Sequence, residues 1–515
     1  MSSCRSTAGR PGVAGRGRAT PRAPRHELYH EIFGSILDRT EMTPYLLLPA
    51  KDYPWALRQA TRMLGNRGFD TAGADDLSER ERVRAAGYVR ESRRYLGEWL
   101  LPFMQLQLGA LARLHSANEP LYRRCLRVLA ALRATLADPA LARLMDEDPR
   151  HLFLLASSRR YPGLFRGYHG GSLAVPLAWR RMGCAMLKTA HLIKSIEEDS
   201  QDINDYAQLG LFLTRRGRNL DDLFHLDWYA PSELPEQEPA QRAFVKISTF
   251  FHKLAESMTF AAGRGGYVFS SGDGVDVDIV EVKARLKSPE SMFTKLGRTR
   301  QGEAHDIRDI LAITFLLRSR DDTLTLFHAL QKRGVILQEN VLSHSITQTL
   351  FNSPEEMLEA VRRLTLNLAR SEGSARRWTM ARLRGAARQF FAALSARTKD
   401  NPDSALGHHK LQCKINYSLP IHRDCRSGRI LIPGTAAYDA RDAAPIATQQ
   451  HTIPVELRIS DAQSWHAGEW KGDAHHDAYR CRQLLALANR LFAPRFCFPD
   501  EAIARLREDQ SLIFA

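Results

Sequence analysis

The sequence has no long hydrophobic run, no closely spaced cysteine pair and no acidic residue in its first 26 positions. No apolar stretch approaches the ~20 residues that a membrane-spanning helix needs, which excludes a transmembrane protein. The 7 cysteines are scattered and include no C-x-x-C pair. This pattern argues against a disulfide scaffold and a zinc cluster, and it predicts reduced thiols in a cytoplasmic protein.

Residues 1–26 also lack the apolar segment of a secretory signal. They are rich in Arg, Gly, Ala, Ser and Pro, and we interpret them as a disordered basic tail. An organelle transit peptide, which is likewise rich in arginine and poor in acids, is the alternative.

The composition is that of an ordinary globular protein with a strong positive charge. Of the 515 residues, 44% are hydrophobic and 25% are charged, which excludes a largely disordered or fibrous protein. At roughly 100–200 residues per domain, the length predicts two to four folded units. The formal net charge of +15 favours anionic partners, either nucleotides or nucleic acid.

Residues 27–240 have the hydrophobic pattern of packed amphipathic helices. Apolar residues recur at three- and four-residue spacing at Leu100, Leu101, Met104, Leu108, Leu111 and Leu114, and again at Leu126, Leu129, Leu132 and Leu136. This spacing places them on one helical face. The pattern predicts an all-α region without a catalytic constellation, for which we expect a docking or regulatory role.

After this region the pattern becomes strand-like. A helix over 243–261 leads into a glycine-rich turn at 263–266. Four segments then have the pattern of strands, namely 275–279, the continuous apolar run 309–317, 411–419 and 453–459. We therefore predict an α+β fold, in which the all-α region precedes a mixed-sheet domain over 241–495 and a C-terminal extension over 496–515.

The densest group of cationic and hydroxyl side chains lies where a predicted strand passes into a helix. Ser288 suits the N-cap and Pro289 the first helical position. The unbonded backbone N–H groups of a helix N-terminus would therefore lie here. The side chains that would converge on this point are Arg285, Lys287, Ser288, Ser291 and Lys295. Such donors and positive charge bind a polyphosphate, although a basic turn that faces water has the same pattern.

Two acidic residues lie on predicted strands of the same domain. Asp309 begins the continuous apolar strand, where its carboxylate can hold Mg²⁺ or merely cap the strand end. Glu456 alternates with apolar residues, so Glu456 and Arg458 face a common surface, although a lone glutamate on a strand is usually just solvated. Phosphoryl transfer needs carboxylates near a metal together with a cationic cradle, and the combination favours that chemistry.

Four motifs, in the correct order along the chain, resemble those of RelA/SpoT-type alarmone synthetases. Residues 285–291 with Lys295 resemble the ATP-binding motif, 309–313 the metal-binding strand and 455–459 the strand of the catalytic glutamate. Trp465-His466, Gly472 and the run 476–480 resemble the closing motif. The resemblance covers roughly 245–490 and implies a nucleotidyltransferase-like sheet domain with a helical insertion.

The resemblance implies an ATP- and Mg²⁺-dependent pyrophosphokinase. The residues implied to bind ATP are Arg285, Lys287, Ser288, Ser291 and Lys295. Asp309 and Glu456 would hold the metal, and Glu456 would also activate the 3′-hydroxyl of the acceptor. That hydroxyl would receive pyrophosphate from ATP, with release of AMP.

The implied acceptor is a purine nucleotide such as GDP or GTP, as in alarmone (ppGpp) synthesis, or the 3′ end of a tRNA. The residues implied to bind it are His408, Lys410, Arg458, His476 and Tyr479. His408 would stack on the acceptor base.

Several positions depart from the family pattern. Thr314 stands where the family usually has Arg, and His408 where it has Tyr. Where the family has Glu-x-Gln-x-Arg, this chain has residues 456–460. Arg458 therefore stands in place of the Gln, and Ser460 in place of the final Arg. These departures motivate an alternative, a catalytically degenerate regulator that binds a nucleotide or RNA.

A helical insertion predicted over 354–398 carries many arginines and one acidic residue from Val361 onward. Its cations would bind RNA phosphates and favour a tRNA acceptor, as some toxin members of the family do. A solvated basic helix is the simpler interpretation of the same composition.

A second pattern resembles polymerase-β-like nucleotidyltransferases. Gly265-Gly266 is followed by Asp276 and Asp278, two carboxylates one residue apart on a strand. In that family such a pair binds two metals, and nucleotidyl transfer would follow. An exposed edge strand with an acidic face gives the same pattern.

Overall fold

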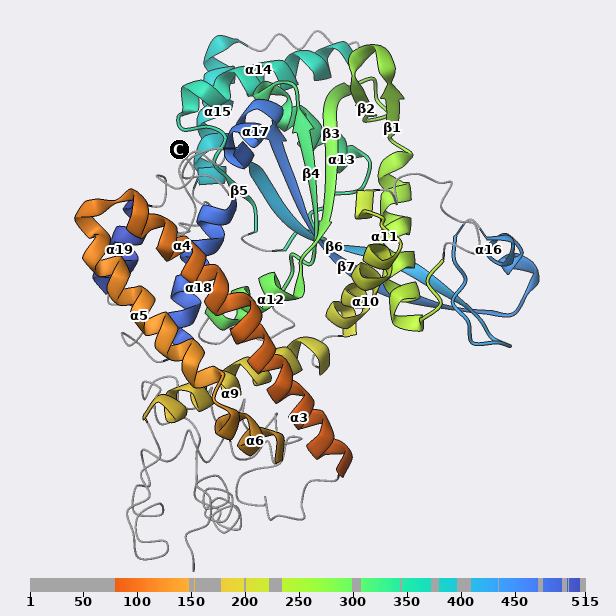
Figure 1. The fold of residues 1–515 in the computed structure, drawn as a ribbon. Helices are drawn as coiled ribbons and strands as arrows, with labels where there is room; N and C mark the ends of the chain where they lie inside the picture. Colours follow the sequence, from red (N-terminus) through yellow and green to blue (C-terminus); the bar gives the residue numbers. More distant parts are fainter. Residues whose placement is uncertain are drawn as a thin grey trace, which may run out of the picture.

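The computed structural model describes residues 79–147, 152, 177–198, 201–221, 234–298, 307–342, 345–371, 379–395, 409–433, 435–470, 476–492, 498 and 500–509. Helices precede a seven-stranded mixed sheet that is itself surrounded by helices, so the predicted α+β class is confirmed (Figure 1). None of the helices in these ranges is long and apolar enough to cross a membrane. The predicted basic tail, 1–26, lies outside the described residues.

The described part of 27–240 is helical and contains no strand, as predicted. Its main helices are α3 (Glu79–Arg94), α4 (Leu101–Leu114), α5 (Glu119–Leu136), α6 (Pro139–Glu147), α9 (Leu177–Glu198) and α10 (Gln201–Arg215). A π-helical segment, η3 (Tyr95–Leu100), joins α3 to α4. The apolar spacing explains the packing, because Leu108, Leu111, Leu129 and Leu132 are all buried on the facing sides of α4 and α5.

The sheet has the strand order β1-β2-β3-β4-β7-β6-β5. Its strands are β1 (Met258–Ala261), β2 (Gly266–Ser270), β3 (Asp276–Leu286), β4 (Leu311–Leu317), β5 (Thr347–Gln348), β6 (Leu411–Asp424) and β7 (Ile446–Asp461). Only the β4–β7 pair is parallel among these neighbours. All seven residues of β4 are buried, as its continuous apolar run predicts for a central strand.

Two details of the predicted pattern were wrong. The helix predicted over 243–261 is α11 (Glu238–Ala255), and residues 258–261 form β1 instead. The glycines explain this turn: Gly265 has a left-handed φ of 65°, and a Cβ at Gly266 would lie 2.2 Å from the carbonyl oxygen of Ile279. The predicted count of four strands missed β1, β2 and β5, which are too short to establish an alternating pattern.

Further helices belong to the C-terminal half, and several of them cover the sheet or contact the N-terminal helices (Figure 1). They are α12 (Pro289–Arg298), α13 (Thr323–Lys332), α14 (Pro354–Ser371), α15 (Met380–Ser395), α16 (Ala436–Asp439), α17 (Ala462–Trp470), α18 (His476–Leu491) and α19 (Asp500–Asp509). The predicted insertion corresponds to α14 and α15. In the C-terminal extension, α19 packs on α5, where the Asn118 amide donates to Asp509 Oδ2 at 2.6 Å.

The helical region and the sheet domain share one hydrophobic core. The ring of Tyr95 lies 4.1 Å from the ring of Phe293 in α12, measured between centroids. The guanidinium of Arg480 in α18 lies 4.8 Å from the ring centroid of Trp99. The N-terminal helices therefore support the two helices, α12 and α18, that border the sheet near the predicted phosphate-binding turn.

We predict that Phe315→Ala lowers the free energy of unfolding by about 3–5 kcal/mol, because it opens a cavity in the central strand β4. Phe260→Ala is the matched control, since Phe260 is 65% exposed and should cost far less. Chemical denaturation of both variants measures the difference. Equal losses would contradict the assignment of β4 to the centre of the core.

Candidate functional site

One face of the sheet carries two adjacent rows of mainly polar side chains across β3, β4, β7 and β6. Residues at matching positions form a first row of Arg285, Ala312, Glu456 and Lys414 and a second row of Lys283, Thr314, Arg458 and Gln412. Directly paired residues share a face, and so do residues two apart on a strand. The intervening residues are apolar and face the other side. The alternation therefore assembles the charges on one surface.

The predicted strand-to-helix turn is present at the edge of this face. The backbone N–H of Lys287 donates to the carbonyl of Ile310 at 2.7 Å, which fixes the end of β3 beside the start of β4. Ser288 Oγ accepts from the backbone N–H of Ser291 at 3.3 Å and so caps α12, whose first residue is Pro289. The backbone N–H groups at the N-terminus of α12 thus lie next to the two rows.

Asp309 lies between two lysines at this turn. Its carboxylate forms ion pairs with Lys287 and, at 2.5 Å, with Nζ of Lys295. Burial alone would raise the pKa of Asp309, but the ammonium groups of Lys287, Lys295 and Lys414 hold it well below its ordinary value. Burial lowers the pKa of Lys287 to about 8, although Asp309 opposes that shift. Asp309 is therefore an anion that neutralises a buried lysine.

Glu456 is 3% exposed and forms an ion pair with its strand neighbour Arg458. Burial, the largest single effect, would raise its pKa, but the charges of Arg458, Lys410 and Lys414 together lower the pKa to about 2. Asp309 acts in the opposite direction on the same pKa, so the two carboxylates repel each other across the site. Asp309 and Glu456 are therefore ionised members of one electrostatic group.

Arg285 and Tyr479 belong to the same group. Arg285 is exposed to solvent on one side, and crowding by neighbouring groups, followed by the charge of Arg458, lowers its pKa, while Glu456, Asp309 and Tyr479 act to raise it. The structure thus brings together Arg285, Asp309 and Glu456, which come from β3, the start of β4 and β7. It also places Tyr479 of α18 close enough to act on Arg285.

Lys410 lies just before β6 and approaches the group from the other side. Its backbone carbonyl accepts from the N–H of Thr349 at 2.8 Å, and the carbonyl of the preceding residue, His409, accepts from Ser460 Oγ at 2.6 Å. Burial lowers the pKa of Lys410 to about 7, and the nearby cations Arg458, Arg285 and Lys414 add to the shift. This lysine is therefore held in a strongly cationic environment.

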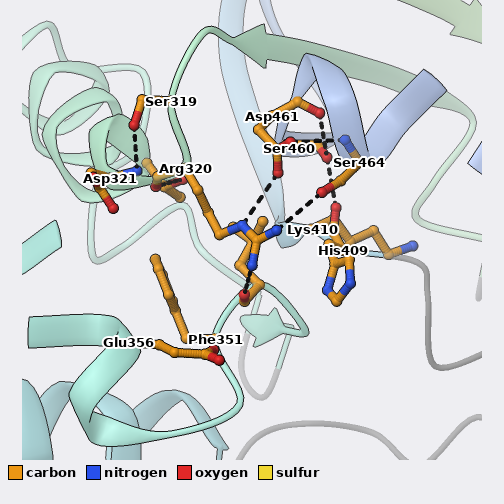
Figure 2. A network of polar contacts seen from close by, with 12 residues as sticks. Ser319, Arg320, Asp321, Phe351, Glu356, His409, Lys410, Ser460, Asp461 and Ser464 are labelled. Carbon is orange, nitrogen blue, oxygen red and sulfur yellow. Dashed lines mark hydrogen bonds and ion pairs between the residues drawn. The ribbon is translucent and has the colours of Figure 1, made fainter. Parts of the chain in front are cut away.

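A polar network that the sequence did not reveal supports the Lys410 segment (Figure 2). Arg320, in the turn η11 (Arg320–Asp322), donates to the carbonyl of Leu350 at 3.2 Å and to Ser464 Oγ at 3.3 Å. Its Nε lies 3.4 Å from Asp461 Oδ2, and Asp461 Oδ1 accepts from the N–H of Ser464 at 2.8 Å. Polar residues directly after β4 and β7 were the available signal, because the carboxyl ends of parallel strands meet at one edge.

Other predicted site residues are only partly placed. His408 lies outside the described residues, and so does the side chain of His476, although its backbone begins α18. Thr314 is buried on the charged face, directly beside Arg458.

The competing pair, Asp276 and Asp278, lies at the opposite end of β3 from Arg285. Asp278 forms an exposed ion pair with Arg264 at 2.8 Å. The structure does not bring these two carboxylates into the rows that contain Glu456. A polymerase-β-like pair of metal ligands therefore gains no support from the geometry.

The carboxylates fit Mg²⁺ bound together with phosphates. Among the described residues, no three or more His, Cys, Asp or Glu side chains are arranged for a metal ion. Mg²⁺ usually binds one or two carboxylates and takes its other ligands from substrate phosphates and water. Asp309 and Glu456, ionised and close enough to repel each other, match that donor set.

We predict that Lys410→Met raises the free energy of unfolding at pH 7 by about 1 kcal/mol, because it removes a cation from a cationic, half-buried position. The unfolded chain keeps the lysine proton up to about pH 10.4, whereas the folded protein releases it near pH 7. Wild-type stability should therefore rise with pH across this window relative to the variant.

Denaturation curves of wild type and variant between pH 7 and 10 measure this difference. Lys253→Met is the control, since the side chain of Lys253 is partly exposed and pairs with exposed Glu256. A difference between wild type and Lys410→Met that does not change with pH would contradict the assigned environment of Lys410.

No protein-family model matches this chain, and no curated protein matches it either. The geometry of the charged face is therefore the basis for assigning a function.

Proposed function

We propose that the protein is a RelA/SpoT-like pyrophosphokinase that uses ATP and Mg²⁺. It would transfer pyrophosphate from ATP to the 3′-hydroxyl of a purine nucleotide or of a tRNA. The observation that carries the proposal is the convergence of Arg285, Asp309 and Glu456 on one face of the sheet, where Asp309 and Glu456 both act on the pKa of Arg285 and Asp309 acts on that of Glu456. These residues are far apart in the sequence, and the adjacency of β3, β4 and β7 in the sheet brings them together.

The triphosphate of ATP would bind at the turn between β3 and α12. Lys287 and Lys295 flank this turn, and the N-terminal amides of α12 point toward it. Cations outnumber carboxylates on the face, and their mutual repulsion contributes to the lowered pKa values of Arg285, Lys287 and Lys410. A polyphosphate would supply counter-charge to this excess of cations.

The transfer would form a bond from the acceptor 3′-oxygen to the β-phosphorus of ATP and break the bond from that phosphorus to the α,β-bridging oxygen. AMP would leave with that oxygen, and Glu456 would orient the attacking hydroxyl and receive its proton. Mg²⁺ held by Asp309 and Glu456 would supply charge neutralisation on the phosphates. Arg285 and Arg458 would stabilise the negative charge on the transferred group.

Arg458 offers a physical explanation for the departure at Thr314. The family's arginine on the β4 strand is absent here, but Arg458 lies on β7 directly beside Thr314. A guanidinium is long enough to reach the same space from either strand. We infer that the arginine function moved from β4 to its parallel neighbour, so that the site keeps its cation.

A tRNA acceptor is supported by the surface of α15. This helix contains no acidic residue, and Arg382, Arg384 and Arg388 are exposed on it. It contacts β5, whose neighbouring residue Thr349 holds the Lys410 segment. A basic helix beside the proposed acceptor site would attract a nucleic-acid backbone.

We predict that Glu456→Gln lowers the rate of AMP release at least a hundredfold, because the variant can neither hold the metal nor accept the proton. ATP affinity should change far less, since the cations of the turn remain. AMP release is measured from labelled ATP with Mg²⁺ and, in separate reactions, GDP, GTP, ATP and deacylated tRNA.

Glu359→Gln is the matched control, because Glu359 is exposed and lies on α14 away from the charged face. Wild-type protein that is folded and binds ATP, but releases no AMP with any acceptor, would contradict the proposal and support the regulator. Turnover unchanged in Glu456→Gln would remove Glu456 from the mechanism.

We also predict that Arg458→Gln, which restores the residue usual in the family, lowers turnover about a hundredfold. Adding Thr314→Arg to that variant should recover at least tenfold, because the guanidinium returns to the space from β4. Arg458→Gln also leaves the buried Glu456 without its ion-pair partner, which can destabilise the fold. Thermal unfolding of each variant therefore checks that a loss of turnover is not a loss of folded protein. A double variant no more active than Arg458→Gln would contradict the exchange of positions.

A further inference from the structure

The distal half of β7 is the edge of a two-stranded arm. Beyond α11, β6 and β7 continue as a hairpin that projects from the sheet toward α16 (Figure 1, blue). Strand β4 pairs with β7 only from Val455 onward, so in the described part of the chain no strand pairs with the outer side of residues 446–454. The outer edge of this segment therefore differs from the rest of the sheet.

The hydrogen bonds of β6 identify which residues of β7 point outward. Even-numbered residues of β6 form backbone hydrogen bonds with segments on the side away from β7. The carbonyls of Lys414 and His422 accept such bonds, and the N–H groups of Asn416 and Asp424 donate them. The N–H and C=O of one strand residue point to the same side, so the odd-numbered residues of β6 bond to β7. The pairing is continuous over the whole hairpin.

The same alternation applies to β7 because its odd-numbered residues pair with the odd-numbered residues of β6. The even-numbered residues Thr448, Gln450 and Thr452 therefore direct their N–H and C=O groups away from β6. All three are exposed, and no backbone hydrogen bond from a described residue reaches this edge. Pro454 is also even-numbered, so its missing N–H would have pointed away from β6. The proline therefore removes no hydrogen bond from the β6–β7 hairpin.

Apart from Pro454 at its inner end, the edge lacks the charged residues that usually prevent strand pairing. Residues 443–455 include no Asp, Glu, Lys or Arg, although 25% of the chain is charged. A two-fold contact places each residue near its own copy or its symmetric counterpart, so an uncharged edge is compatible with itself. In a chain of net charge +15, this is a surface on which two copies can meet without repulsion between adjacent charged side chains.

We propose that two copies of this chain associate through this edge, with β7 of one copy antiparallel to β7 of the other and Gln450 on the two-fold axis. This register pairs Gln450 with Gln450 of the other copy and Thr448 with Thr452. Cross-strand threonine pairs are favourable, and all three outward residues then bond in complete pairs. The two seven-stranded sheets would become continuous through their arms.

The register makes a specific substitution informative. Gln450→Pro removes an N–H that points outward and leaves every hydrogen bond of the β6–β7 hairpin in place. On the two-fold axis it removes both bonds of the central pair, so self-association should weaken about thirtyfold. Gln450→Ala is the matched control, because it removes the side chain but keeps the N–H. Sedimentation of the full chain over a concentration series measures both.

Cysteine cross-linking tests the register itself. In a Cys425→Ser background, Gln450→Cys should form a disulfide between copies under mild oxidation, because hydrogen-bonded antiparallel partners have Cα atoms about 5.5 Å apart. Thr448→Cys alone should not, since the two copies of position 448 would lie about 14 Å apart. A mixture of Thr448→Cys and Thr452→Cys proteins should cross-link.

These outcomes separate the proposal from other modes of association. A concentration-dependent dimer that Gln450→Pro weakens, together with Gln450→Cys cross-linking, is the expected result. Wild type that stays monomeric throughout the series overturns the proposal. A dimer that Gln450→Pro leaves unchanged, or one in which Thr448→Cys cross-links to itself, also overturns it. None of these readouts depends on pyrophosphokinase activity.

Discussion

The rest of the site depends on the pairing of partly buried lysine and arginine side chains with two carboxylates on one sheet face. Asp309 holds Lys287 and Lys295 at once, and so ties the end of β3 and the first turns of α12 to the start of β4. Burying a charge without a partner costs far more than a surface ion pair gains. The positions of the strand end and the helix N-terminus are therefore coupled to one acidic side chain.

The N-terminal helices contribute to the same geometry from a distance. Helix α9 packs against both α12 and α18, and Tyr95 contacts Phe293 on α12. The core is continuous across this boundary, so α12 cannot shift relative to β3 without disturbing the helical region. This packing gives the helical half a direct structural route to the proposed phosphate-binding turn, which is what a regulatory region would need.

The sequence predicted the parts of the site that depend on local pattern. The Ser288 cap and the buried strand β4 are present as predicted, because capping and a continuous apolar run are set by neighbouring residues. The short strands β1, β2 and β5 were missed, since pairing across the sheet, not local propensity, creates them. Arg320 and its contacts to Asp461 and Ser464 were also missed, because the three segments meet there only after folding.

The electrostatics of the site also explain why some of its residues cannot be identified from a sequence pattern. Lys410 has a pKa of about 7 because burial and several cations act on it together, and those cations come from three other strand segments. A folded protein keeps such a cluster only at a cost in stability, and a ligand that supplies negative charge recovers that cost on binding. An excess of positive charge beside two ionised carboxylates is what the proposed binding of an anion together with a metal ion would require. Such an excess depends on the summed environment of the fold, and a motif in the sequence carries only part of it.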